Sequence, residues 1–118
     1  MWSCRLAFAS LFLIAGSTHA EEAKCPAHQG INVLASATLF DGPPSEMASL
    51  TPDISRGSGD HAYSSWDVRY LFDAGRKLYL VCQYAGTEKT TTIKVDKKVK
   101  QCIYRTHTAH TPAELSCK

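Results

Sequence analysis

The chain lacks several features on which common protein functions depend. No two cysteines have the C-x-x-C spacing, so neither a zinc knuckle nor a thioredoxin-like redox site is indicated. The G-x-S-x-G sequence that surrounds the nucleophile of many hydrolases is also absent. The formal net charge is only +2, whereas nucleic-acid binding needs a strongly basic face. We therefore expect no nucleic-acid partner, no cofactor and no enzymatic activity.

Long hydrophobic runs are absent too, apart from a short one near the N-terminus. Residues Leu6 to Ala15 are apolar except for Ser10; Arg5 precedes them and small residues ending at Ala20 follow. A run of about ten residues is too short to cross a bilayer of about 30 Å as a helix. This layout predicts a secretory signal peptide at residues 1–20, cleaved after Ala20, so the protein is exported without membrane insertion. Residues 21–118 are then short enough to form a single domain.

Four cysteines remain after cleavage, an even number in a short exported chain: Cys25, Cys82, Cys102 and Cys117. In an oxidising compartment we expect two disulfides, for which three connectivities are possible. Cys102 and Cys117 lie symmetrically about the middle of a predicted connection between two strands. Facing residues of an antiparallel pair have Cβ atoms about 4.5–5.5 Å apart. A disulfide requires a shorter Cβ–Cβ distance, about 3.5–4.5 Å, so the two cysteines must face each other at a non-hydrogen-bonded pair, where the strands are closer. We prefer Cys102–Cys117, which leaves Cys25–Cys82 to tie the N-terminal segment to a central strand.

Strand-like segments alternate with short turn signals, and no segment carries a sustained helical stripe of apolar residues. The strongest segment is Lys77–Tyr84, which is apolar on both faces, as in a central strand. The other expected strands cover residues 31–40, 61–72, 90–95, 99–106 and 113–117, with a hairpin turn at 73–76 and another turn at 96–98. We predict a mostly β fold: a small antiparallel sandwich or curled sheet, arranged as a meander and stapled by disulfides. At most one short helix is expected, near Glu46–Leu50.

Two groups of residues have side chains that could carry chemistry. Ser58, Asp60 and His61 are neighbours in sequence, but any polar loop offers such a set. His107 and His110 flank a turn, yet a metal site needs three or four converging ligands. We therefore expect exposed loop residues at both places, with no catalytic centre and no metal site.

Two segments are better suited to binding a protein partner. Residues Asp41, Gly42, Pro43 and Pro44 form a stiff loop, and stiff loops lose little conformational entropy on binding. The second candidate is the Arg56–Tyr63 loop, through Ser58, Asp60, His61 and Tyr63. Aromatic residues between Tyr63 and Phe72 are expected mainly in the core, although any left outside could anchor a partner.

Basic residues gather locally although the whole chain is nearly neutral. Six of them lie between residues 89 and 105: Lys89, Lys94, Lys97, Lys98, Lys100 and Arg105. We interpret them as the solvated face and turn of a hairpin, and the alternative is a patch that meets an acidic partner.

Several stretches together resemble a family of small exported proteobacterial proteins. They are F-D-G-P-P-S-E at residues 40–46, A-S-L-T-P-D at 48–53, W-D-V at 66–68 and L-V-C-Q-Y-A-G-T at 80–87, followed by Cys102 and Cys117. The resemblance implies a periplasmic, disulfide-bonded, non-enzymatic β protein. Some members lie beside type VI secretion genes and toxins related to L,D-transpeptidases. This association implies an immunity protein that binds and blocks a peptidoglycan-targeting toxin.

Residues Ser58 to Tyr63 also resemble the S-G-x-x-Y-like loop of periplasmic inhibitors of c-type lysozyme. The spacing differs here, and a second lysozyme-blocking motif is not evident. The alternatives to an immunity protein are therefore a lysozyme inhibitor or an envelope component without a tight partner.

Overall fold

The computed structural model describes residues 23–106, 108 and 111–118. The expected signal peptide, its cleavage site at Ala20, and the turn residues His107 and His110 lie outside the described residues. The expectations for these segments stay predictions.

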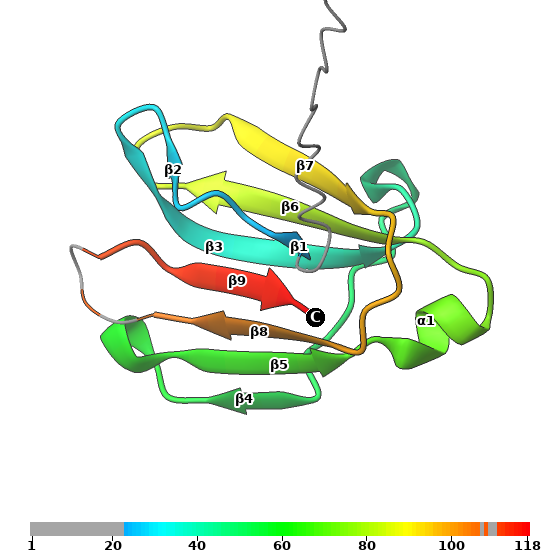
Figure 1. The fold of residues 1–118 in the computed structure, drawn as a ribbon. Helices are drawn as coiled ribbons and strands as arrows, with labels where there is room; N and C mark the ends of the chain where they lie inside the picture. Colours follow the sequence, from blue (N-terminus) through cyan, green and yellow to red (C-terminus); the bar gives the residue numbers. More distant parts are fainter. Residues whose placement is uncertain (1–22, 107, 109–110) are drawn as a thin grey trace, which may run out of the picture.

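The described residues contain nine strands in two antiparallel sheets (Figure 1). The first sheet has five strands in the order β1 (Ala23–Lys24), β9 (Glu114–Cys117), β8 (Gln101–Arg105), β5 (Tyr63–Asp67) and β4 (Ile54–Arg56). The second sheet has four strands in the order β2 (His28–Gln29), β3 (Asn32–Asp41), β6 (Leu78–Tyr84) and β7 (Thr90–Val95). The predicted mostly β, antiparallel fold class is thus confirmed.

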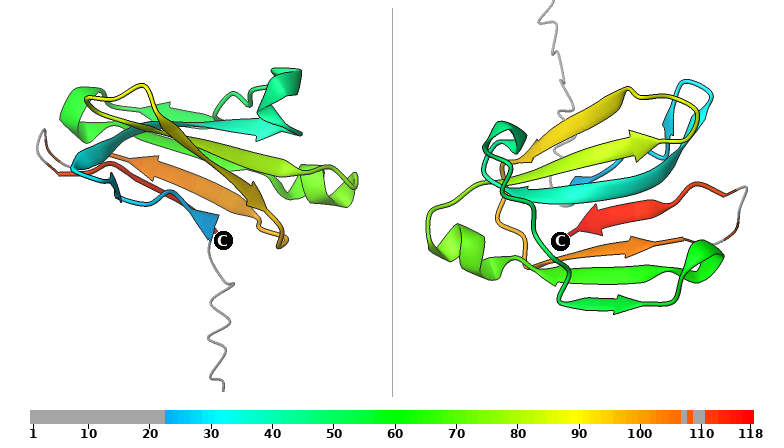
Figure 2. Two further views of the ribbon diagram at one scale, coloured as in Figure 1. Left: turned by 90° about the horizontal axis from the view of Figure 1, so that it is seen from above. Right: turned by 180° about the vertical axis from the view of Figure 1, so that it is seen from behind.

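The two sheets meet where β9 lies between β8 and β3 (Figures 1 and 2). The N–H of Ala113, immediately before β9, donates a hydrogen bond of 2.9 Å to the carbonyl oxygen of Leu34 in β3. The N-terminal segment links the sheets a second time, because β1 pairs with β9 whereas β2 pairs with β3. Buried residues from both sheets therefore form one continuous hydrophobic core.

Strand β6 is central in its sheet, as predicted from its composition. It pairs with β3 on one side and with β7 on the other. Its alternate residues are buried, because successive side chains of a strand point to opposite faces: Leu78, Leu80, Cys82 and Tyr84. The Tyr84 hydroxyl donates a hydrogen bond of 2.9 Å to the Pro26 carbonyl oxygen, so its polar tip is satisfied next to the core.

Both preferred disulfides are present, Cys25–Cys82 and Cys102–Cys117. Cys102 and Cys117 are direct partners in the register of β8 and β9, as the symmetric spacing suggested. Cys25 follows β1 and reaches the middle of β6, so this disulfide fastens the N-terminal segment across both sheets. All four cysteines are buried.

The strand predicted at residues 61–72 is wrong in its second half. Strand β5 ends at Asp67, and residues Arg69–Asp73 form the short helix α1. Tyr70 and Phe72 favour strands by propensity, which explains the error. The fully buried residues, however, are Val68 and Leu71, and a spacing of three places them on one side of a helical turn. The short helix expected near Glu46–Leu50 begins earlier, as the single 3₁₀ turn η1 (Pro44–Glu46).

The predicted meander is also wrong, because only four pairs of successive strands are neighbours: β2–β3, β4–β5, β6–β7 and β8–β9. The turn expected at residues 73–76 follows α1 and connects β5 in one sheet to β6 in the other. The turn at residues 96–98 likewise connects β7 to β8 across the sheets. Each connection carries a buried side chain, Leu71 in the first and Val99 in the second, and so extends the core instead of closing a hairpin.

Candidate protein-binding surfaces

The first predicted binding segment, Asp41–Pro44, forms a closed loop at the end of β3. The Gly42 N–H donates a hydrogen bond of 2.7 Å to the Lys77 carbonyl oxygen, which fixes the loop to the start of β6. After η1, Met47 takes a left-handed backbone conformation with φ of 58°. Its side chain is 84% exposed. The loop therefore presents a large apolar side chain on a well-anchored backbone.

An ion pair joins this loop to the segment after α1. The Arg76 Nε donates a hydrogen bond of 2.6 Å to Asp41 Oδ1, and this hydrogen bond is the main cause of the raised pKa of Arg76. Tyr70, on α1, is 56% exposed. Partial burial raises the pKa of the Tyr70 hydroxyl, and the nearby Asp41 carboxylate raises it further. We call Asp41, Met47, Tyr70 and Arg76 the loop–helix surface.

The second predicted segment, Ser58–Tyr63, is held by contacts within the protein. Its middle forms the 3₁₀ turn η2 (Gly59–His61). The Thr106 hydroxyl donates a hydrogen bond of 2.7 Å to the Gly59 carbonyl oxygen and accepts one of 2.7 Å from the Ala62 N–H. Ser58, Asp60 and His61 are exposed around this turn.

Tyr63 lies at the end of the same segment, beside two arginines. The guanidinium carbons of Arg56 and Arg105 lie 4.8 and 5.3 Å from the centre of the Tyr63 ring. Both distances fall within the range of cation–π attraction. The face of Tyr63 is therefore already engaged within the protein, which makes this aromatic a weaker anchor than Tyr70.

The two predicted binding segments lie at opposite ends of the molecule. Turn η1 and helix α1 are at one end, and turn η2 is at the other (Figures 1 and 2). The structure therefore does not bring Asp41–Pro44 and Ser58–Tyr63 together into one site.

Of the polar residues considered for chemistry, the structure describes Ser58, Asp60 and His61, and all three are exposed. No side-chain hydrogen bond in the described part of the chain involves Ser58, Asp60 or His61. Over the same residues, no group of three or more histidine, cysteine, aspartate or glutamate side chains could hold a metal ion.

Two exposed residues, Met47 and Arg69, were not among the binding candidates predicted from the sequence, and Tyr70 was expected mainly in the core. Met47 was placed in a short helix, and Arg69 and Tyr70 in a strand. Tyrosine and arginine are common among the residues that dominate binding energy. The spacing of Val68 and Leu71 was the one available sign that Arg69 and Tyr70 stand on the outer side of a helical turn.

Comparisons with known proteins give the following similarities. Residues 27–118 match the family described as type VI secretion system Tli immunity protein. A curated relative, an uncharacterised 16.3 kDa protein from the trpG 5′ region of Azospirillum brasilense, is 28% identical, with 75% of this chain and 73% of the relative covered. No solved structure matches the chain.

No helix among the described residues is long and apolar enough to span a membrane. The family match includes every strand from β2 to β9, both predicted binding segments and helix α1. The chain therefore belongs to the type VI secretion system Tli immunity protein family.

Proposed function

We propose that this protein acts in the periplasm, where it binds a toxin delivered by type VI secretion and blocks the toxin's action. The observation that carries the proposal is the family match over residues 27–118. The leader-like residues 1–20 and the two disulfides support a periplasmic location, because disulfides persist in oxidising compartments. The protein acts by binding, without catalysing a reaction of its own.

The proposed target is a toxin that attacks peptidoglycan, of the L,D-transpeptidase-like type. The F-D-G-P-P segment at residues 40–44 supports this target, because it carries the resemblance to proteins found beside such toxins. The predicted signal peptide supports it too, because it would bring the protein to the compartment that contains peptidoglycan.

The proposed contact with the toxin is the loop–helix surface together with Pro43 and Pro44; Gly42 is buried and holds the loop through its hydrogen bond to Lys77. Its exposed Met47 and Tyr70 offer apolar contact area, and the Asp41–Arg76 ion pair fixes the backbone on both sides. A surface that is already ordered loses little entropy on binding. The Ser58–Tyr63 segment, at the other end of the molecule, is the second candidate.

Coexpression tests this function directly. Bacteria would produce the toxin encoded beside this gene, directed to the periplasm, together with either the full chain or a chain lacking residues 2–20. We expect the full chain to protect the cells and to copurify with the toxin, and the leaderless chain to give no protection. Lysis despite the full chain, with no copurification, would contradict the proposal.

Analysis of the intoxicated cells tests the class of toxin separately. Altered peptidoglycan cross-links in unprotected cells would support the proposed target. Intact peptidoglycan with damaged membrane lipids would leave the immunity function standing and overturn the cell-wall target. Stoichiometric inhibition of a purified c-type lysozyme, without protection against the toxin, would favour the alternative function.

A further inference from the structure

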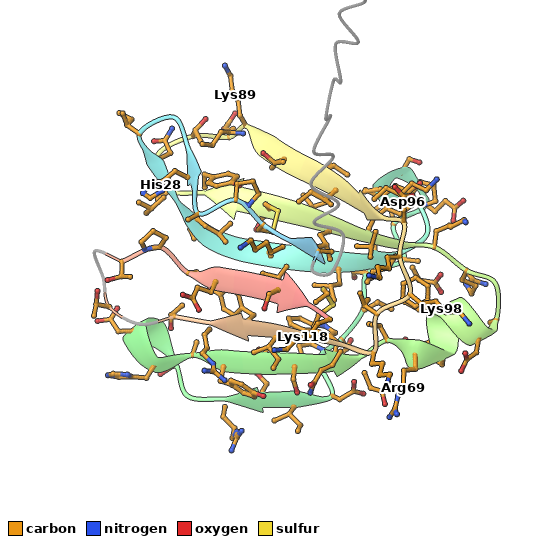
Figure 3. The ribbon with its side chains drawn as sticks, viewed as in Figure 1. His28, Arg69, Lys89, Asp96, Lys98 and Lys118 are labelled. Atoms are coloured by element: carbon orange, nitrogen blue, oxygen red, sulfur yellow. A yellow bond between two sulfur atoms is a disulfide. The ribbon has the colours of Figure 1, made fainter. Side chains whose placement is uncertain are left out.

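A set of basic side chains surrounds the connection between β7 and β8, at the same end of the molecule as α1. Figure 3 shows Arg69 and Lys98 at that end, whereas Lys89 lies at the far end of the sheet. Lys100 belongs to the same set, because it lines the same hollows as Arg69. The basic residues singled out in the sequence therefore do not form one hairpin face, since β7 and β8 are in different sheets, and two of them lie beside Arg69 of α1.

Two neighbouring hollows run between these basic side chains. The first has a volume of about 190 Å³ and is lined by Arg69, Phe72, Asp73, Lys98, Val99 and Lys100. The second, of about 300 Å³, is lined by Asp67, Arg69, Lys100 and Gln101. Arg69 and Lys100 border both, so the two hollows are adjacent. We call them together the basic groove; the first hollow has an apolar wall to which Phe72 and Val99 contribute.

The backbone of the basic groove is firmly held. Val99 is only 4% exposed and anchors the connection in the core. The carbonyl oxygen of Lys100 accepts a hydrogen bond of 3.0 Å from the Val68 N–H, just before α1. Both walls of the groove therefore exist before any partner arrives, which lowers the entropic cost of binding.

Three cationic side chains and two carboxylates, Asp67 and Asp73, line the basic groove, so it keeps a net positive charge. Lys98 and Lys100 are exposed, and within the described part of the chain neither has a carboxylate at ion-pair distance. Arg69 donates from Nε and Nη2 to Asp67, at 3.2 and 2.9 Å. A guanidinium has five N–H donors, so three remain after these two hydrogen bonds. The Asp67 contact thus holds Arg69 in place without using up its capacity to bind a carboxylate.

We propose that the basic groove binds an acidic segment of the toxin, an inference that rests on the proposed immunity function. Carboxylates of that segment pair with Arg69, Lys98 and Lys100, and an apolar side chain next to them packs on the half-buried Phe72. The apolar wall favours a protein segment over an anionic lipid surface, because a headgroup would leave that wall without a partner. Opposite charges also accelerate encounter and exclude wrongly charged partners.

Charge reversal tests this inference on the full chain, purified from the periplasm after coexpression with the toxin. The test variant is K98E/K100E, the matched single changes are K98E and K89E, and K98R/K100R keeps the charge. We expect K98E/K100E to weaken toxin binding by roughly tenfold or more at low salt, and K89E and K98R/K100R to bind like the unmodified protein. Binding by the unmodified protein should also weaken as salt increases.

The controls separate a failure of the groove from a failure of the function. Circular dichroism and the mass of the unreduced protein verify that each variant is folded and disulfide-bonded. Because both lysines are exposed and unpaired, K98Q/K100Q offers a milder variant should the double reversal fail to fold. Unchanged toxin binding by the folded variants would overturn the proposed role of the basic groove and leave the proposed immunity function standing. Absence of toxin binding by the unmodified protein would overturn both.

Vesicles of phosphatidylglycerol provide the final comparison. We expect no binding of the unmodified protein to these vesicles at physiological salt. Vesicle binding that K98E/K100E abolishes, with toxin binding unchanged, would assign the groove to a membrane surface and overturn the inference.

Discussion

Among single residues, Gly57 and Gly59 share a left-handed backbone but differ in their surroundings. Their φ angles are +71° and +59°. A Cβ atom on Gly57 would lie 2.0 Å from the His61 carbonyl oxygen, whereas a Cβ on Gly59 would meet nothing within 4 Å. The close approach at Gly57 is what allows the chain to turn back before β5.

We therefore predict that Gly57→Ala destabilises the protein much more than Gly59→Ala. Both changes force alanine into a left-handed conformation, at about 1–2 kcal/mol. Gly57→Ala must also displace backbone, for which we expect a further loss of about 1–3 kcal/mol. Urea unfolding measures the free energy of unfolding of both variants. Equal losses of this free energy would show that the turn at Gly57 is not packed as described.

The contact between Asp67 and Arg69 leads to a prediction about the pKa of Asp67. The Arg69 side-chain hydrogen bond is the main cause that lowers the pKa of Asp67 below its ordinary value of 3.8. A carboxyl group whose pKa is lowered by folding stabilises the folded state at neutral pH. This contribution is lost as the pH falls through the folded-state pKa.

We expect Arg69→Gln to raise the pKa of Asp67 toward its ordinary value, while the backbone N–H of residue 69 continues to lower it by a smaller amount. An NMR titration of the aspartate carboxyl carbons measures this change, with Arg76→Gln as the matched control, since Arg76 contacts Asp41 instead. A pKa of Asp67 that does not change in Arg69→Gln would rule out the Arg69 side chain as the main cause of its lowering.

The strands and helices differ in how well the sequence predicts them. Strand β6 was recognised because its alternating burial requires apolar residues on every second position, and Leu78 to Tyr84 supply them. Helix α1 was missed because five residues are too few for a periodic pattern, and because Tyr70 and Phe72 favour strands. The edge strand β4 has three exposed residues, so its sequence carries no burial pattern at all.

The assignment of α1 leads to a prediction for two neighbouring residues. Leu71 is fully buried and Tyr70 is 56% exposed. Leu71→Ala should therefore lower the free energy of unfolding by about 2–5 kcal/mol, because it leaves a cavity in the core. Tyr70→Ala should lower it by less than about 1 kcal/mol. Urea unfolding measures both losses. A larger loss for Tyr70→Ala than for Leu71→Ala would indicate that these residues form the strand predicted from the sequence.

The two disulfides should contribute unequally to stability. Cys25–Cys82 spans 57 residues and Cys102–Cys117 spans 15. Loop-closure entropy alone then gives about 4 kcal/mol for the first and about 3 kcal/mol for the second. The β8–β9 pairing also holds Cys102 and Cys117 in register without the bond. We expect the double alanine variant at Cys25 and Cys82 to unfold at lower urea than the variant at Cys102 and Cys117; the opposite order would contradict this account.

At the scale of the whole molecule, the sequence offered candidate segments but not their arrangement. Loops were predicted at Asp41–Pro44 and Ser58–Tyr63, because glycine, proline and polar residues cluster there. Their separation to opposite ends depends on which strands pair, and local composition does not determine that pairing. The basic groove likewise combines residues of the β5–α1 segment with residues of the β7–β8 connection, which lie about 30 positions apart in sequence and are brought together only by the fold.

The whole-molecule arrangement concentrates the proposed contacts at one end. The loop–helix surface and the basic groove share helix α1, which contributes Tyr70 to the former and Arg69 to the latter. The opposite end, with η2 and the engaged ring of Tyr63, then serves as a natural control surface. A toxin that binds at the α1 end should protect amides of residues 69–73 from hydrogen exchange and leave those of 59–63 unchanged.

The central claim is that this protein neutralises a type VI toxin by binding it. Titration of the purified toxin with the purified, disulfide-bonded protein, while the toxin's activity on its substrate is followed, tests that claim most directly. We predict stoichiometric binding and a parallel loss of toxin activity. A toxin that stays fully active in an excess of the folded protein would contradict the claim.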